Sequence, residues 1–236
     1  DLVSYISKHN EANAEDNRDG DNQNHSSNGG VEGETDDAQI VMWRVNRARS
    51  LMASVFVAQG VPFLTAGDER WRTQGGNNNA YCQDSELSWI DWQKTAESEQ
   101  MFAFVRSLIA VRKAHSALRR HSFLTGLADP GSGRCDVLWL KDAGERLSSA
   151  AWHGAGLDHF GALIEPENRL HSNASGEGRS GPLLLLFNQS SKERVFVVPG
   201  GREDEWLCLI DSSLSVISER IFGMSEITVP PVSVQL

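Results

Sequence analysis

Side chains able to bind a sugar gather in one polar loop of the sequence. Asn77, Asn78 and Asn79 stand in a row, with Tyr81 two residues further on and Trp71 shortly before them. Amides both donate and accept hydrogen bonds, and aromatic faces stack on pyranose rings. The loop is therefore a candidate sugar-binding element. The alternative is a turn-rich loop, because Asn tolerates left-handed backbone.

Two carboxylates, Asp68 and Glu69, come directly after the nearly all-apolar run VPFLTA at 61–66. Such a run is typical of a strand buried on both faces, as in a parallel sheet. The two side chains then either shape a cleft and hold its neighbours, or satisfy backbone groups where the strand ends, for example in an Asx-turn. Both interpretations stay open.

A third polar group stands near the start of the sequence, where His9 and Asn10 lie among Lys8, Glu11 and Asn13. These residues either line a cleft or form a solvated loop. Residues 1–34 are so rich in Asn, Asp and Gly that we expect order there only if another segment packs against them.

Two helices are expected to position these loops. The first begins after Asp36 as N-cap and ends at Gly60, with Pro62 preventing its continuation. Its apolar stripe recurs at spacings of three and four, through Val41, Val45, Ala48, Met52, Val55 and Phe56. The second helix is expected at roughly 96–115, with a stripe of Met101, Phe104, Val105, Leu108 and Ile109.

Beyond about residue 120 the pattern changes to short apolar runs separated by Gly, Pro, Ser and Asn, which predicts an antiparallel β-domain. Trp139, Trp152 and Trp206 are interpreted as core residues of this domain rather than as a binding platform. The runs are VLWL (137–140), FGALI (160–164), LLLLF (183–187), RVFVV (194–198), WLCLI (206–210), ITV (227–229) and the final SVQL.

Composition excludes several classes of partner. The 236 residues carry a net charge of -10 and no large basic cluster, which argues against nucleic acid and against anionic lipid. The sequence contains no 18-residue apolar run, and its three cysteines match neither a disulfide framework nor a zinc pattern. We expect a cytoplasmic protein without a metal site, and neutral ligands such as sugars remain open.

Several segments resemble bacterial glycogen debranching enzymes, the isoamylase-type members of the alpha-amylase superfamily. DLVSYISKHNEANAEDNRDG is similar to the segment after their seventh barrel strand, GVPFLTAGDE to the eighth strand and its exit, and GGNNNAYCQDSELSWIDW to the following loop. LIAVRKAHSALR looks like the last barrel helix, and AAWHG, LLLLFNQS, WLCLIDSS and VPPVSVQL look like the C-terminal domain.

The resemblance implies a fold in two parts. Residues 1–119 would be the C-terminal portion of a (β/α)8 barrel, with strand 8 and its flanking helices. Residues 120–236 would be an antiparallel β-sandwich. Asp68 and Glu69 would then lie at the carboxyl end of a barrel strand, which is the catalytic face of this fold.

The resemblance also implies a parent enzyme that hydrolyses α-1,6 branch linkages in glycogen or limit dextrin without an organic cofactor. Such hydrolysis needs a nucleophile and a general acid, to which the family adds a third acid. All three would fall upstream of residue 1, and Asp1 matches a later, non-catalytic Asp. No catalytic residue is therefore expected here, and the chain alone should be inactive. The alternative is a non-catalytic glucan-binding module, or a partner chain that completes a split barrel.

Overall fold

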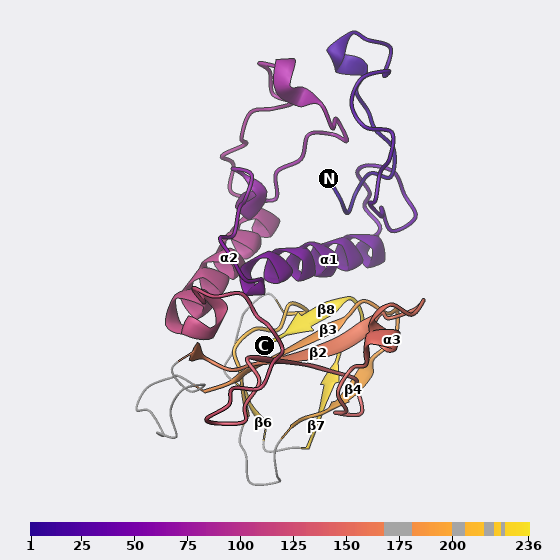
Figure 1. Ribbon diagram of the computed structural model, residues 1–236. Coiled ribbons are helices and arrows are strands. Elements are labelled where there is room, and N and C mark those ends of the chain that lie inside the picture. The colour runs from indigo at the N-terminus through magenta and orange to yellow at the C-terminus, as the bar shows by residue number, and fades with distance from the viewer. Residues whose placement is uncertain (168–180, 200–205, 215–219, 223–224) are drawn as a thin grey trace. The chain divides into compact units, whose positions relative to one another are not determined.

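The computed structural model describes the chain apart from residues 168–180, 200–205, 215–219 and 223–224 (Figure 1). The chain divides into two compact units. The first unit comprises Asp1–Arg49 and Leu64–Val105, and the second comprises Ser50–Phe63 and Arg106–Leu236. Both long helices continue from one unit into the other.

Helix α1 spans Ala38–Val57 and confirms the first expected helix. Its N-cap is Asp37 rather than the predicted Asp36, because Asp37 Oδ1 accepts a hydrogen bond from the Gln39 N–H at 2.9 Å. The cap satisfies one of the unpaired amides of the first turn. Of the predicted stripe, Met52 and Phe56 are buried. In the described part of the chain no helix is both long and apolar enough to span a bilayer.

Helix α2 spans Ala96–Ala114, within a residue of the prediction, and Met101, Phe104 and Leu108 are buried along it. Its Arg112 closes the C-terminal end of α1. The Arg112 guanidinium donates to Phe56 O at 2.6 Å and to Ala58 O at 2.8 Å, and it also donates to Gly60 O. A cation suits the negative end of a helix, so a buried arginine holds the turn where α1 ends.

The prediction of a strand at 61–66 is wrong, because these residues form no backbone pairing with any described strand. Val61 is 94% exposed and Phe63 90% exposed. A strand buried on both faces exists only between neighbouring strands, and no described strand lies beside these residues. The apolar pattern is present, but the elements that would cover it are not among the described residues.

The predicted β-runs do form strands, all in the second unit. Four of them make an antiparallel sheet in the order β1-β2-β3-β8, and two further pairs are β4-β7 and β5-β6. Only β6 was not expected from the sequence. The strands are β1 (Val137–Leu140), β2 (His159–Ile164), β3 (Leu183–Asn188), β4 (Arg194–Val197), β5 (Trp206–Cys208), β6 (Arg220–Phe222), β7 (Glu226–Val229) and β8 (Ser233–Gln235).

A core cluster joins one face of the four-stranded sheet to the β4-β7 pair. Leu140, Leu184 and Leu186 pack there with Phe196 and Val229. Each such side chain contributes roughly 1.5–3 kcal/mol when fully buried. Of the three tryptophans assigned to the core, only Trp206 packs against this cluster. The assignment is wrong for Trp139 and Trp152, which are 36% and 41% exposed.

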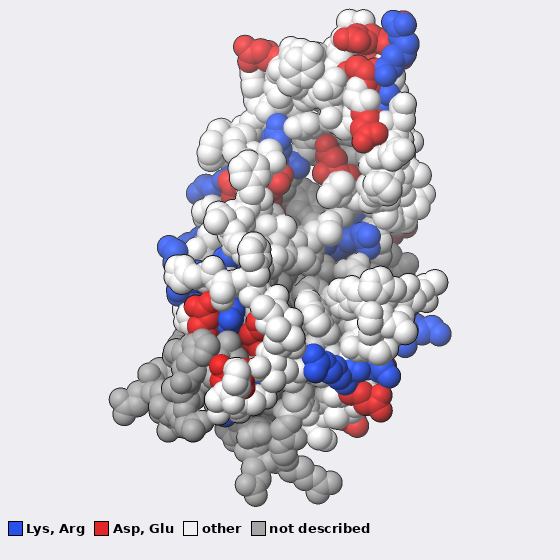
Figure 2. Space-filling view, in the orientation of Figure 1, with Lys and Arg blue, Asp and Glu red and all other residues white. Residues whose placement is uncertain are grey.

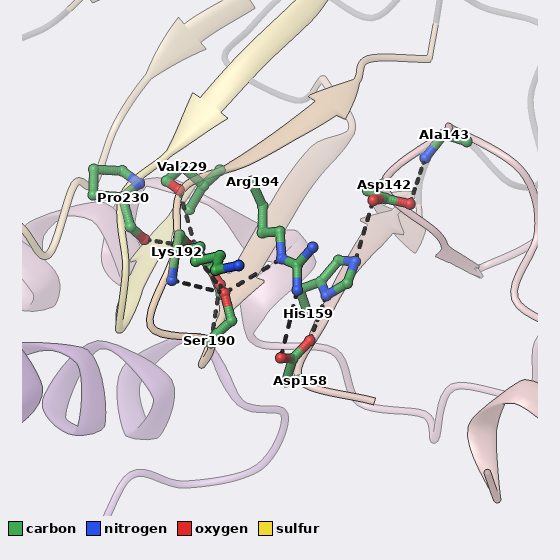
Figure 3. Close-up of polar contacts among 10 residues, drawn as sticks. Asp142, Ala143, Asp158, His159, Ser190, Lys192, Arg194, Val229 and Pro230 are labelled. Atoms are coloured by element: carbon green, nitrogen blue, oxygen red, sulfur yellow. Dashed lines mark hydrogen bonds and ion pairs between the residues drawn. The ribbon is translucent and has the colours of Figure 1, made fainter. Parts of the chain in front are cut away.

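Polar contacts tie the loops of the β-domain together (Figure 3). His159 Nδ1 lies 2.6 Å from Asp158 Oδ1, and His159 Nε2 lies 3.2 Å from Asp142 Oδ2. Arg194 reaches both Asp158 and Ser190. The hydrogen bond with His159, helped by the charge of Arg194, lowers the pKa of Asp158. The loop before β2 is therefore held to β4 and to the connection between β1 and helix α3 (Ser149–Trp152).

The same network ends on Asn188, which is fully buried at the end of β3. Its Nδ2 donates to Lys192 O at 2.8 Å and to Val229 O at 3.0 Å. Its Oδ1 accepts from the Ser190 N–H at 3.0 Å. One amide thus satisfies the backbone of the β3–β4 turn and of the end of β7, which would otherwise be buried without partners.

Candidate functional site

The asparagines of the two polar loops bind each other, in a group that we call the asparagine cluster: Asn10, Asn13, Asp19, Asn77, Asn78 and Asn79. Asn10 Nδ2 donates to Asn78 Oδ1 at 2.9 Å, and the Asn78 N–H donates back to Asn10 Oδ1 at 3.0 Å. Asn10 is fully buried. A Cβ on Gly20 would come within 2.2 Å of Asn78 Oδ1, so the pair needs glycine there.

The remaining members of the cluster extend the same link. Asn77 Nδ2 donates to Asn13 Oδ1 at 3.0 Å, and Asn79 Nδ2 donates to Asp19 Oδ2 at 2.7 Å. Hydrogen bonds from Asn13 and Asn79 lower the pKa of Asp19. These amides therefore fix the 76–83 loop to the first polar segment. This is the packing that the sequence required for residues 1–34 to be ordered.

His9 belongs to a neighbouring contact, centred on the carboxylate of Glu32. The Ile6 and Ser7 N–H groups, Asn28 Nδ2 and His9 Nε2 all lie 2.8–3.0 Å from its oxygens. Burial alone would raise the pKa of Glu32, but these hydrogen bonds outweigh it and lower the pKa to about 2. The His9 ring also meets Tyr5 edge-on at 5.3 Å. Glu32 thereby joins the 5–9 stretch to the 28–33 loop.

Arg44, on α1, holds the other side of the 28–33 loop. Its buried guanidinium donates to three backbone carbonyls, those of Asn28, Gly33 and Val31. Because the contacts go to the backbone, the loop is fixed without using its side chains.

A cavity of about 240 Å³ opens among these loops, within the first unit. It is smaller than the roughly 300–1,000 Å³ of a site for a drug-sized ligand, which suits one part of a longer molecule. Most of the residues that line it are polar, and one carries a phenol ring; they are Asp1, Leu2, Tyr5, Asn24, Thr65, Asp68, Arg72, Gln74, Gly76, Asn77 and Asn78.

Only some of the site residues predicted from the sequence line the cavity. Asp68, Asn77 and Asn78 line it, while Asn10 and Asn79 belong to the asparagine cluster and not to the lining. His9, Glu69 and Tyr81 lie outside the lining.

The two adjacent carboxylates differ in their surroundings. Glu69 Oε2 accepts a hydrogen bond from the Gly67 N–H at 2.9 Å, so it satisfies the backbone at the start of its own turn. Burial raises the pKa of Asp68, and the charge of Glu69 adds to the effect against the opposing charge of Arg72. Asp1, the other carboxylate of the lining, accepts hydrogen bonds from Thr73 Oγ1 and from the Gln74 N–H.

The aromatic residues of the loop lie at its surface. Tyr81 is 86% exposed, and Trp89 and Trp92 are exposed as well. Trp89 Nε1 donates to Asp84 at 2.9 Å, and the Arg70 guanidinium lies over the Trp92 ring. Of these three, Tyr81 presents the most open ring face.

Sequence reasoning did not single out Tyr5, Arg72 and Glu32. Tyr5 stands in the DLVSY motif that carries part of the family resemblance, and this is the signal that could have found it. Nothing in the local pattern marks Arg72 or Glu32, because their partners lie far away in the sequence.

Curated proteins match the chain over most of its length. It is 41% identical over 219 residues to a glycogen operon protein GlgX homolog from Mycobacterium bovis, and 41% identical over 221 residues to a glycogen debranching enzyme from Yersinia pseudotuberculosis. The chain is homologous to bacterial glycogen debranching enzymes. The matches cover 90% and 94% of this chain but 30% of each relative. No family model matches the chain.

Solved structures of pullulanases resemble the chain in fold. A pullulanase from Bacillus acidopullulyticus covers 85% of this debranching-enzyme homologue with a TM-score of 0.60 and 20% identity, over 21% of its own chain. A pullulanase from Anoxybacillus, complexed with maltotetraose, covers 81% with a TM-score of 0.57 and 19% identity, over 23% of its own chain. Helices followed by antiparallel sheets match one region of these larger proteins.

Proposed function

We propose that this chain forms part of a glycogen debranching enzyme, a glycoside hydrolase that cleaves α-1,6 branch linkages in glycogen or limit dextrin. The observation that carries the proposal is the 41% identity over 221 residues to a glycogen debranching enzyme. The proposal includes residues 1–119 as the C-terminal portion of a (β/α)8 barrel and 120–236 as a β-sandwich domain. It also includes a cytoplasmic location, which the reduced state of Cys82, Cys135 and Cys208 favours.

In this proposal the first unit contributes to substrate binding. Asp68, Asn77 and Asn78 line a cavity of mixed donors and acceptors, and the exposed Tyr81 offers a ring face to a sugar. Asn10, Asn79, His9 and Glu69 act by holding these loops. A neutral glucan suits the charge distribution. The net charge is -10, and on the face in Figure 2 basic side chains lie interspersed with acidic ones.

The chain alone is proposed to be inactive. Retaining hydrolysis needs two carboxyl groups about 5–5.5 Å apart, one as nucleophile and one as acid. Among the described residues of the cavity lining, the carboxylates are Asp1 and Asp68, and Asp1 is held by Thr73 and Gln74. Asp68 is therefore proposed to shape the cleft and not to attack the linkage.

A chimera tests the proposal. The chain is fused to the part of the Yersinia pseudotuberculosis relative that it does not match, and release of reducing ends from glycogen limit dextrin is measured. We expect debranching by the fusion and none by the purified chain or by the added part alone. An inactive but folded fusion would contradict the proposed function, and turnover by the 236 residues alone would contradict the inactivity.

The alternative is a partner chain that completes a barrel by association. The exposed Val61 and Phe63 favour it, since an uncovered apolar segment marks a surface that another polypeptide covers. Mixing the chain with the same unmatched part, unfused, distinguishes the two cases: activity on mixing supports association, and activity only in the fusion excludes it.

A further inference from the structure

Four aromatic rings form a connected group in the β-domain, which we call the aromatic platform: Trp139, Trp152, Phe160 and Phe187. The Trp139 and Trp152 ring centroids are 4.9 Å apart, and Phe160 contacts both indoles at 5.9 and 5.5 Å. Phe187 stacks on Phe160 at 4.9 Å. The platform is continuous across three consecutive strands and one helical turn.

The register of the sheet places the platform away from the β-domain core. Trp139 lies opposite Ala162, and Phe160 lies opposite Phe187. Side chains alternate between the faces of a sheet, so these rings share the face opposite Leu140, Leu184 and Leu186. Trp139 stands on β1, which is an edge strand of the sheet.

Helix α3 (Ser149–Trp152) brings the fourth ring to this face. Ser148 caps the turn by accepting a hydrogen bond from the Ala151 N–H at 3.1 Å. None of the four residues of α3 is buried. The turn therefore adds nothing to the core, and the ring contacts of Trp152 are what it provides to the domain.

Both indoles of the platform are partly exposed. Trp139 is 36% exposed and Trp152 41% exposed. Trp43 and Trp92 each have a guanidinium over the ring, but no such pair involves Trp139 or Trp152 within the described residues. Two adjacent, partly exposed indoles leave apolar surface in water, and no guanidinium lies over them within the described residues.

We propose that the aromatic platform binds an α-glucan chain, at residues that share none with the cavity of the first unit. The proposal rests on the proposed function, in which the parent protein acts on such chains. Indole faces stack on the apolar faces of sugar rings, while exposed indole N–H groups donate to sugar hydroxyls. The occupant is neutral, since a polyanion would meet a chain of net charge -10.

The inclination of the two indoles selects among neutral glucans. Their planes are tilted by 52°. Successive units of an α-1,4-linked chain turn with respect to each other, so inclined rings meet successive units of a curved chain. A flat β-1,4-linked ribbon would lie on coplanar rings instead. We therefore expect α-linked chains to bind more tightly than β-1,4-linked ones.

The test follows the indole N–H signals of the seven tryptophans in the whole chain by NMR, assigned through single Trp→Phe variants. Maltoheptaose is expected to shift the signals of Trp139 and Trp152 while that of Trp206 stays, and cellohexaose is expected to shift none. In affinity electrophoresis through glycogen, the double variant W139A/W152A should bind at least about tenfold more weakly, equal to about 1.4 kcal/mol. Phe123→Ala is the control, because Phe123 is 96% exposed and lies outside the platform.

Several results would overturn the inference. One is that W139A/W152A binds glycogen as tightly as the unmodified chain, whereas Tyr81→Ala abolishes binding. This result would refute the platform but not the proposed function. Another is that the indole signals of the platform shift only when the unmatched part of the Yersinia pseudotuberculosis relative is added. The platform would then be a contact surface between polypeptides. Absence of maltoheptaose binding also refutes it, while the activity of the fusion decides the proposed function separately. If the double variant does not fold, the signal shifts of the unmodified chain still decide.

Discussion

Replacing Glu32 by Gln should destabilise the first unit in a way that depends on pH. The carboxylate accepts hydrogen bonds from the Ile6 and Ser7 N–H groups and from Asn28, and it contacts His9. Gln keeps the size of the side chain, but its amide group is a donor that meets other donors. The variant therefore removes the charge-assisted bonds without opening a cavity.

The size of the effect follows from the pKa of Glu32, which lies at about 2 instead of the ordinary 4.5. A pKa lowered by this much corresponds to at most about 3 kcal/mol of unfolding free energy. The side chain is 31% exposed, and solvent screens such contacts, so we expect about 1–2 kcal/mol.

The direction with pH is fixed by the sign of the shift. Because folding lowers the pKa of Glu32, the carboxylate stabilises the fold fully above pH 4.5, and this contribution is lost as the pH falls toward about 2. Urea unfolding of the unmodified chain and of Glu32→Gln should therefore differ most at about pH 7 and converge near pH 2. The matched control is Glu34→Gln, an exposed carboxylate two residues away. A stability difference that stays constant between these pH values would refute the reasoning.

Three further predictions concern single side chains. Arg112→Lys should lower the unfolding free energy by about 2–3 kcal/mol, because one ammonium cannot reach three carbonyls at once; unchanged urea midpoints would contradict the assigned role. Asn188→Ala should cost about 2–3 kcal/mol of unfolding free energy by leaving buried backbone groups unpaired, and Gln189→Ala, at an exposed neighbouring position, is the control. Asp68→Asn should raise the melting temperature at about pH 7, since burial raises the pKa of Asp68 and its charge therefore opposes folding. The gain should shrink as the pH falls and the carboxyl takes up its proton, and a melting temperature lowered at neutral pH would contradict this.

The sequence predicted well those helices and strands that a short apolar pattern defines. The stripe of Met101, Phe104 and Leu108 set α2 to within a residue, and the apolar runs after residue 120 found every strand except β6. The strand at 61–66 failed because a strand requires neighbours, and an apolar run cannot report whether they are present. The alternation in VLWL distinguishes the two faces of the strand, but it does not indicate that Trp139 remains 36% exposed.

Roles in the candidate site were harder to predict than elements. The row Asn77–Asn79 was correctly placed in a loop, and Asn77 and Asn78 line a cavity. The sequence could not indicate that Asn10 and Asn78, 68 residues apart, use their amides on each other. An amide has the same composition whether it faces a ligand or a second loop, so only the fold distinguishes the two.

The hydrogen bonds of Arg44 to three backbone carbonyls have a consequence for sequence variation. A loop shaped through its carbonyls does not depend on which side chains it carries, as long as its glycines allow the path. We therefore expect the exposed position 31 to tolerate exchanges and position 44 to require arginine, because lysine would lose the fork of donors. Exchanges at position 31 could alter the surface of the loop while its course stays the same.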